Sequence, residues 1–196
     1  MKLTFHNISA LLLVTLSILF QVKGVAEEHR SHDSHTHGVA KLTVAVDNDV
    51  VEIEFRSPAV NLIGFEHQAS TKLDFEEINR AKAILNQNNV MFSFSGGDCQ
   101  LINHFVDVSS IIDKSQLKGH QPKRSKYSHQ HDDNHTDVHA TYHYSCENTS
   151  SLTSITVNVF TLFENIQQAQ AFWINSSTQG VVLLNSKSNV INFQSL

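Results

Sequence analysis

The sequence predicts an α+β fold, a single domain with a mainly antiparallel sheet, two or three helices and a flexible histidine-rich insert. Three observations lead to this class. Apolar and polar residues alternate in about eight short segments, which is typical of strands. The helical patterns are few and lie early in the chain. The length of 196 residues is enough for one domain with a buried core, and no internal repeat of useful length is visible.

The first 26 residues read as a secretory signal peptide. Lys2 precedes an apolar run from Ile8 to Phe20, and residues 24–26 (Gly-Val-Ala) offer small side chains to a signal peptidase. The run is too short for a membrane span, and no later segment reaches the roughly 18 apolar residues that a spanning helix needs. We therefore expect a soluble, exported protein without a membrane span.

A flexible, polar arm is expected over residues 27–38, followed by the folded domain over residues 39–196. The domain begins with a hairpin, because residues 39–46 and 50–55 alternate on either side of an Asp-Asn-Asp turn. A short helix, Pro58–Ile63, should follow. Ser57 can cap its start and Gly64 can end it.

A longer helix is expected from Lys72 to about Asn86. Thr71 can act as its N-cap, acidic residues crowd its first turn, and apolar residues recur at helical spacing. A helical turn is expected over 162–166. Further strands are expected over residues 91–94, 100–108, 138–146, 154–159, 168–174, 180–184 and 189–193. Residues 113–136 form a basic, histidine-rich insert, long enough to be a flexible loop unless metal orders it.

The charge balance argues against nucleic acid as a partner. The formal net charge is −5 with histidine neutral, and it becomes −7 once the two lysines of the leader are removed. Such an acidic protein has no electrostatic basis for binding nucleic acid or anionic lipid. The one basic cluster lies in the polar insert, where it reads as part of a solvated loop.

Two cysteines, Cys99 and Cys146, are present in the whole chain. In an oxidising compartment two cysteines favour a disulfide, which would stabilise the fold by about 4 kcal/mol on the chain-entropy estimate. Ligation of zinc by the cysteines is the alternative, although neither has a partner at CxxC spacing.

Histidine is the most informative residue type, since the chain contains 13. Ten lie in two clusters: His29, His32, His35 and His37, and then His120, His129, His131, His135, His139 and His143. Neutral imidazole is a common ligand for zinc and copper, and short histidine-rich tracts are typical of metal binding. The plain alternative is a solvated polar linker that happens to contain histidines.

The spacing of the histidines separates a fixed site from a loop. His139 and His143 lie on one predicted strand, about 13 Å apart, so they cannot share a zinc ion whose ligand bonds are about 2 Å long. One of them would therefore need partners from elsewhere. The candidates stand at the ends of predicted elements: His35, His37, Glu66 and His67. His67 taken alone is more typical of a surface or capping residue, and its position next to Glu66 is what favours a ligand.

The insert offers a different kind of ligand set. Several imidazoles and carboxylates follow one another on a flexible backbone: His129, His131, Asp132 and His135. Such a segment loses conformational entropy when it wraps an ion, and it selects metals poorly. We expect weaker, multiple and exchangeable sites there, which suits capture of an ion followed by its transfer.

The order of motifs resembles the ZrgA-like family of periplasmic zinc-binding proteins. Residues 35–45 read His-Thr-His-Gly-Val-Ala-Lys-Leu-Thr-Val-Ala, and residues 57–67 read Ser-Pro-Ala-Val-Asn-Leu-Ile-Gly-Phe-Glu-His, both in the family's pattern. Gly-Asp-Cys at 97–99, the insert and the strand at 139–148 complete it. The resemblance implies zinc binding in the periplasm and support of zinc uptake alongside an ABC importer or its binding protein, without catalysis. The insert departs from the family in having fewer histidines and more lysines.

Three other interpretations stay open at this stage. A zinc hydrolase would need three ligands, an open position and a general base, but no HExxH or comparable spacing is present. A secreted β-rich structural or interaction domain could carry its histidines incidentally. A periplasmic buffer for copper or nickel would use the same imidazoles and carboxylates, although Met91 as the only methionine after the leader weakens copper(I).

Overall fold

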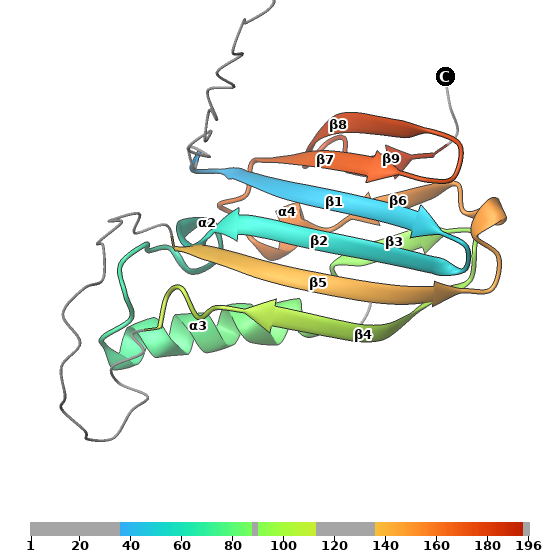
Figure 1. Cartoon of the computed structure of the whole chain (residues 1–196). Helices are drawn as coiled ribbons and strands as arrows, with labels where there is room; N and C mark the ends of the chain where they lie inside the picture. Colours follow the sequence, from blue (N-terminus) through green and yellow to red (C-terminus); the bar gives the residue numbers. More distant parts are fainter. Residues whose placement is uncertain (1–35, 88–89, 113–135, 194–196) are drawn as a thin grey trace, which may run out of the picture. The chain divides into compact units, whose positions relative to one another are not determined.

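The computed structural model describes residues 36–87, 90–112 and 136–193, which form two β-sheets and a few helices (Figure 1). The large sheet contains, in spatial order, β4 (Cys99–Asp107), β5 (Asp137–Cys146), β2 (Val50–Pro58), β1 (Val39–Asp47), β7 (Gln168–Ile174) and β8 (Gln179–Asn185). The small sheet contains β3 (Phe92–Ser95), β6 (Ser154–Val157) and β9 (Val190–Asn192). The helices are α2 (Ala59–Ile63), α3 (Lys72–Leu85), α4 (Val159–Leu162) and the 3-10 turn η1 (Thr149–Ser151).

The predicted α+β class is wrong, because strands dominate the described residues. Nine strands form two sheets there, while α3 with 14 residues is the only helix longer than five. The helices α2 and α4 have only five and four residues and do not build a helical layer. The single sheet expected from the sequence is also wrong, since its last predicted strand, β9, pairs with β6 in the small sheet.

Pairing in both sheets is antiparallel with one exception. The predicted hairpin β1–β2 is present, with Val44 opposite Ile53. On its other side β1 pairs with β7 in parallel, with Val44 opposite Trp173. The strand that opens the domain therefore lies inside the large sheet, between a neighbour in sequence and one from far along the chain.

One face of the large sheet forms the core. Alternate residues of five of its strands point inward and are fully or almost fully buried: Ala40, Leu42, Val44, Val51, Ile53, Phe55, Ala140, Tyr142, Tyr144, Ala169, Ala171 and Leu184. The buried residues of α3 and of the small sheet belong to the same core cluster. The Tyr142 hydroxyl donates a hydrogen bond of 2.9 Å to the Leu85 carbonyl at the end of α3, and burial raises the tyrosine's pKa. The opposite face of the large sheet is called the open face below.

Helix α3 has the predicted start and end. The Thr71 hydroxyl accepts from the Asp74 backbone N–H while the Asp74 carboxylate accepts from Thr71 N–H, which completes a capping box. Helix α2 begins differently from the prediction: its N-cap is Pro58, without a side-chain cap. The Ser57 hydroxyl instead donates to the Pro58 carbonyl. The helical turn predicted over 162–166 lies earlier, as α4.

The predicted disulfide between Cys99 and Cys146 is present. The two cysteines are directly opposite each other in the β4–β5 register, at the end of the sheet where β5 ends. The β2–β5 pair ends at Pro58 and Asp137, at the other end of β5. The disulfide thus lies far from α2, which follows Pro58 (Figure 1).

Candidate metal site

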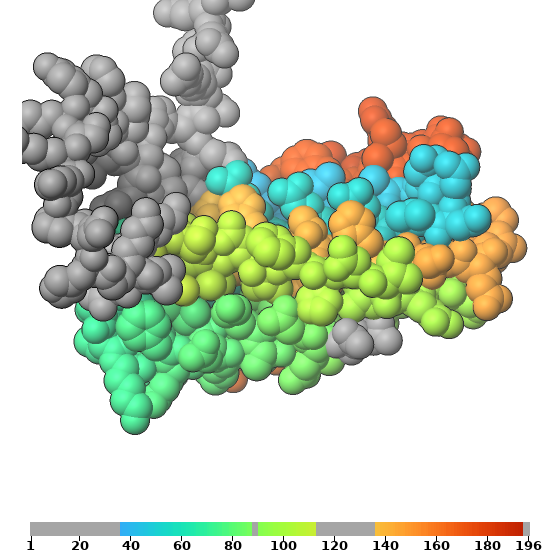
Figure 2. All heavy atoms as spheres, turned by 60° about the horizontal axis from the view of Figure 1, so that its bottom comes forward, coloured from blue at the N-terminus to red at the C-terminus, as the bar shows by residue number. Residues whose placement is uncertain are grey.

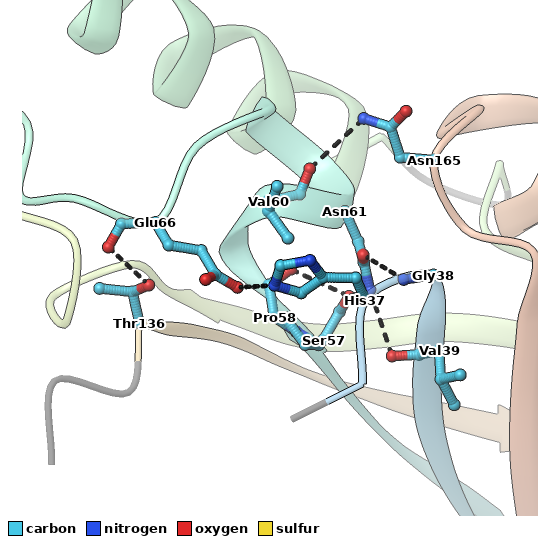
Figure 3. Close-up of polar contacts among 10 residues, drawn as sticks. All are labelled: His37, Gly38, Val39, Ser57, Pro58, Val60, Asn61, Glu66, Thr136 and Asn165. Atoms are coloured by element: carbon cyan, nitrogen blue, oxygen red, sulfur yellow. Dashed lines mark hydrogen bonds and ion pairs between the residues drawn. The ribbon is translucent and has the colours of Figure 1, made fainter. Parts of the chain in front are cut away.

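The candidate site lies where β1 begins, and it is built around His37. The His37 Nε2 is 3.1 Å from the Glu66 Oε1, and both side chains are substantially exposed (Figure 3). His37 directly precedes Gly38, whose φ of +80° lets the chain turn into β1. Glu66 follows α2 by three residues. The pair therefore joins the start of the sheet to the end of a short helix.

Asn61 holds these two segments together. This side chain is 2% exposed. Its Oδ1 accepts from Gly38 N–H at 2.8 Å, and its Nδ2 donates to the Val39 carbonyl at 3.2 Å and to the Ser57 hydroxyl at 3.1 Å (Figure 3). One buried amide of α2 thereby fixes the backbone next to His37. Side chains supported in this way keep a defined direction.

Thr136 brings the beginning of β5 to the same place. Its hydroxyl donates to the Glu66 carbonyl at 3.0 Å, and its own carbonyl accepts from Ala59 N–H at 2.8 Å (Figure 3). The start of α2 and the segment that follows the helix are thus both tied to the residue that precedes β5. Since Thr136 is also the last residue of the predicted insert, the insert rejoins the domain beside Glu66.

His67 takes part in a second imidazole–carboxylate pair. Its Nε2 is 3.4 Å from the Asp74 Oδ2, and its ring stacks on Phe65 with ring centroids 4.5 Å apart. Hydrogen bonds from the backbone N–H groups of Ser70 and Thr71 lower the pKa of Asp74 to about 2, with smaller help from the Thr71 hydroxyl and His67. Asp74 is therefore an ionised partner for His67 across the ordinary pH range.

His139 and His143 lie on the open face, on β5. The register places His139 between Arg56 and Asp107, while His143 lies between Glu52 and Asn103. Because β5 is a strand, as predicted, the two histidines are about 13 Å apart and cannot share one ion. The Arg56 guanidinium beside His139 is itself paired with the Asp137 carboxylate, at 2.6 Å.

The structure brings one pair of predicted ligands together and pairs a third with a carboxylate that the sequence did not single out. His37 contacts Glu66, and His67 contacts Asp74. Across residues 36–87, 90–112 and 136–193, no group of three or more His, Cys, Asp or Glu side chains is close enough to hold an ion. The fixed site expected from the sequence, in which His139 or His143 shares an ion with ligands among His35, His37, Glu66 and His67, stays a prediction. The remaining predicted ligands lie outside the described residues: His35, His129, His131, Asp132 and His135.

Sequence reasoning missed three residues that support the site: Asn61, Thr136 and Asp74. A signal for Asn61 was available, since it is the one polar residue in the α2 sequence Ala-Val-Asn-Leu-Ile. The sequence shows Asp74 only as one of the acids in the first turn of a helix. Its contact with His67 depends on the path of the segment between α2 and α3, which the sequence pattern does not reveal. No local pattern points to Thr136.

Together these features describe a β-rich domain with an imidazole–carboxylate pair fixed at the start of its large sheet, which is a chemistry suited to binding a divalent metal ion. The model of the ZrgA family, described as a zinc uptake protein, matches residues 34–193. The chain belongs to this family, as the resemblance of its motifs indicated, and its role is in zinc uptake. A comparison with curated proteins gives no match. No helix in the described part of the chain is long and apolar enough to cross a membrane.

Proposed function

We propose that this protein binds zinc in the periplasm and supports its uptake by delivering it to an ABC-type importer or to the importer's binding protein. The observation that carries the proposal is the His37–Glu66 pair, because its donor atoms already have the spacing of two zinc ligands. In a tetrahedral site with bonds of 2.0–2.1 Å, neighbouring ligand atoms are about 3.3 Å apart. The His37 and Glu66 atoms are 3.1 Å apart.

The remaining ligands of this fixed site would come from nearby histidines. His67 follows Glu66 directly, and because its Nε2 faces Asp74, its Nδ1 is the atom available for an ion. A carboxylate behind a ligating imidazole orients the ring and raises its basicity. His35 is two residues from His37 in sequence and can complete the set. His139 and His143 are the other candidates that we retain from the sequence.

The histidine-rich insert would supply weaker and exchangeable sites. Its last histidine, His135, is bonded directly to Thr136, and Thr136 contacts Glu66. Ions held by His129, His131, Asp132 and His135 would then pass to the fixed site. This division suits a protein that collects zinc and then hands it over.

The decisive experiment is a zinc titration of purified, metal-stripped mature protein by calorimetry. We expect at least two affinity classes. Deletion of residues 120–135, which leaves Thr136 in place, should lower the stoichiometry and preserve the tightest class. H37A and E66Q should each weaken the tightest class at least tenfold. E164Q, another exposed carboxylate, is the matched control and should bind as the wild type does.

Three outcomes would contradict the proposal. If the tightest class disappears with the insert, the division between fixed and exchangeable sites is wrong. If H139A weakens that class and H37A does not, the fixed site lies on the open face. If the metal-stripped protein binds copper or nickel but does not bind zinc offered alone, the protein is a buffer for another metal.

A further inference from the structure

The two edges of the large sheet differ in how they are protected. Strand β4 forms one edge and carries a bulge between Leu101 and Asn103, and it ends at the charged Asp107. Helix α3 lies alongside it, as Figures 1 and 2 both show. Bulges, charges and covering helices are the devices that prevent an edge strand from pairing with another chain.

Strand β8 forms the other edge and has none of these devices. Its sequence, Gln-Gly-Val-Val-Leu-Leu-Asn, contains no charged residue and no proline. Its register with β7 runs without interruption from Gln179 to Asn185. Among the residues that the structure describes, no strand pairs with its outer side, which forms the upper margin of the sheet in Figure 1.

An apolar patch adjoins this unprotected edge on the open face. It consists of four side chains with exposed fractions between 42% and 61%: Phe172, Ile174, Val181 and Leu183. They leave on the order of 350 Å² of apolar surface uncovered, as much as the largest patch on a typical monomer. A shallow cavity at the patch is lined by Phe172, Ile174 and Val181 among others.

We propose that β8 pairs antiparallel with β8 of a second copy of this chain, joining the two large sheets into one. The strand is self-complementary for this arrangement. If Val182 lies on the two-fold axis, Val181 faces the second copy's Leu183 and Leu183 faces its Val181. Gln179 then faces the second copy's Asn185, so that no like charges meet. Isologous contacts of this kind close as a dimer and do not continue into a fibre.

The surface area buried between the two copies indicates how tightly they associate. Two seven-residue edges and their flanking side chains bury close to the lower limit of about 1,000–1,200 Å² for specific interfaces. The dimer should therefore be reversible. The antiparallel arrangement also leaves the two His37–Glu66 pairs at opposite ends of the joined sheet, so that dimerisation does not cover the proposed zinc site.

The test is sedimentation equilibrium of the mature protein over a range of concentrations, in the presence of a chelator. The chelator removes zinc, so that ions bridging the histidines of two copies cannot produce the dimer. We expect the average mass to rise with concentration toward that of a dimer. V181K should shift the protein toward the monomer, because it places lysine against the second copy's Leu183. L183E should do the same.

The proposed register is tested by combining the two changes. In V181K/L183E each introduced lysine faces an introduced glutamate of the other copy, and the dimer should return. F105K, on the exposed side of β4, is the control and should not change the association. A protein that is monomeric at every concentration would overturn the proposal, and so would a dimer that V181K leaves intact. Failure of the double variant to associate would overturn the antiparallel register.

Discussion

A single buried amide fixes the geometry of the candidate site. Asn61 forms three hydrogen bonds that connect α2 to the backbone beside His37 and to Ser57. Two of its partners are backbone groups, the Gly38 N–H and the Val39 carbonyl, and the third is the Ser57 hydroxyl. Removing the side chain would leave buried donors and acceptors without partners, which costs more than the hydrogen bonds themselves contribute.

We therefore predict that N61A lowers the free energy of unfolding by about 1–3 kcal/mol. The variant should also weaken the tightest zinc class, since the backbone next to His37 loses its support. N165A is the matched control, because the exposed Asn165 makes one long hydrogen bond of 3.4 Å to the Val60 carbonyl. Urea unfolding and zinc titration measure both effects. Equal losses in the two variants would show that Asn61 has no special role.

Zinc binding should depend on pH because imidazole binds a metal only in its neutral form. Histidine ordinarily titrates near pH 6.5, so the affinity should fall as the pH drops through about that value. Titrations at pH 7.5, 6.5 and 5.5 measure this dependence. An affinity that stayed constant down to pH 5 would mean that carboxylates or thiolates carry the site.

Among individual residues, the sequence identifies candidate ligands better than it identifies the residues that hold those ligands in place. Glu66 and His67 were recognised as candidate ligands because they stand together at the end of a helix. The contact between Thr136 and Glu66 joins residues 70 positions apart, so no local pattern could reveal it. The disulfide could be predicted because only two cysteines are available.

Helix α3 is the element whose sequence specifies it most completely. Thr71 and Asp74 form the capping box, and the buried residues Ile78, Ala81 and Leu85 follow at helical spacing. The same carboxylate accepts from Ser70 N–H and lies near His67. The helix start is thereby coupled to the segment that carries the candidate ligands.

We predict that part of the stability of the domain is lost in acid through Asp74. Its pKa of about 2 in the folded protein is below the usual value for aspartate of about 3.9. Its contribution is therefore fully present above about pH 4 and disappears as the pH falls through about 2. D74N lacks this contribution. The difference in unfolding free energy between wild type and D74N should be larger at pH 5 than at pH 2.

A difference that did not change between these two pH values would contradict the role given to the ionised carboxylate. E77Q serves as the control, because Glu77 lies on the same helix and pairs only with the exposed Arg80 among the described contacts.

The strands show that the sequence pattern determines where a strand lies but not which strand it pairs with. Alternation located nearly all of them, because a strand with one buried face repeats every two residues. Alternation does not say which strands pair. Residues 190–192 carry the same pattern whether they join the large sheet or the small one, and only the packing of the two sheets decides it. The α+β class gave the predicted helices too much weight, since two of the three are only four or five residues long.

At the scale of the whole molecule the disulfide and the candidate site are separate. Cys99 and Cys146 join β4 to β5 at one end of the large sheet, across 47 residues that include the insert. The His37–Glu66 pair lies by the opposite end of β5, near Thr136. The bridge therefore constrains the unfolded chain without contributing an atom to the site.

We predict that C99A/C146A lowers the free energy of unfolding by about 4 kcal/mol, the chain-entropy value for a closed loop of this length. The tightest zinc class should remain in the folded variant. Chemical unfolding and zinc titration of the variant, beside the oxidised wild type, measure the two properties. Loss of the tightest class while the fold is kept would mean that the cysteines are zinc ligands.

The parallel pairing of β1 with β7 determines how late in synthesis the large sheet can form. Val39 is opposite Gln168 and Ala45 is opposite Ile174, so about 130 residues separate the partners along the chain. Synthesis delivers β1 first among the strands, but one of its two neighbours emerges only near the end. Contacts of such long range form late and slow the folding of a domain. The segment that carries His37 leads into β1, so it is fully supported only after almost the entire chain has been synthesised. An incomplete chain therefore cannot form the complete candidate site.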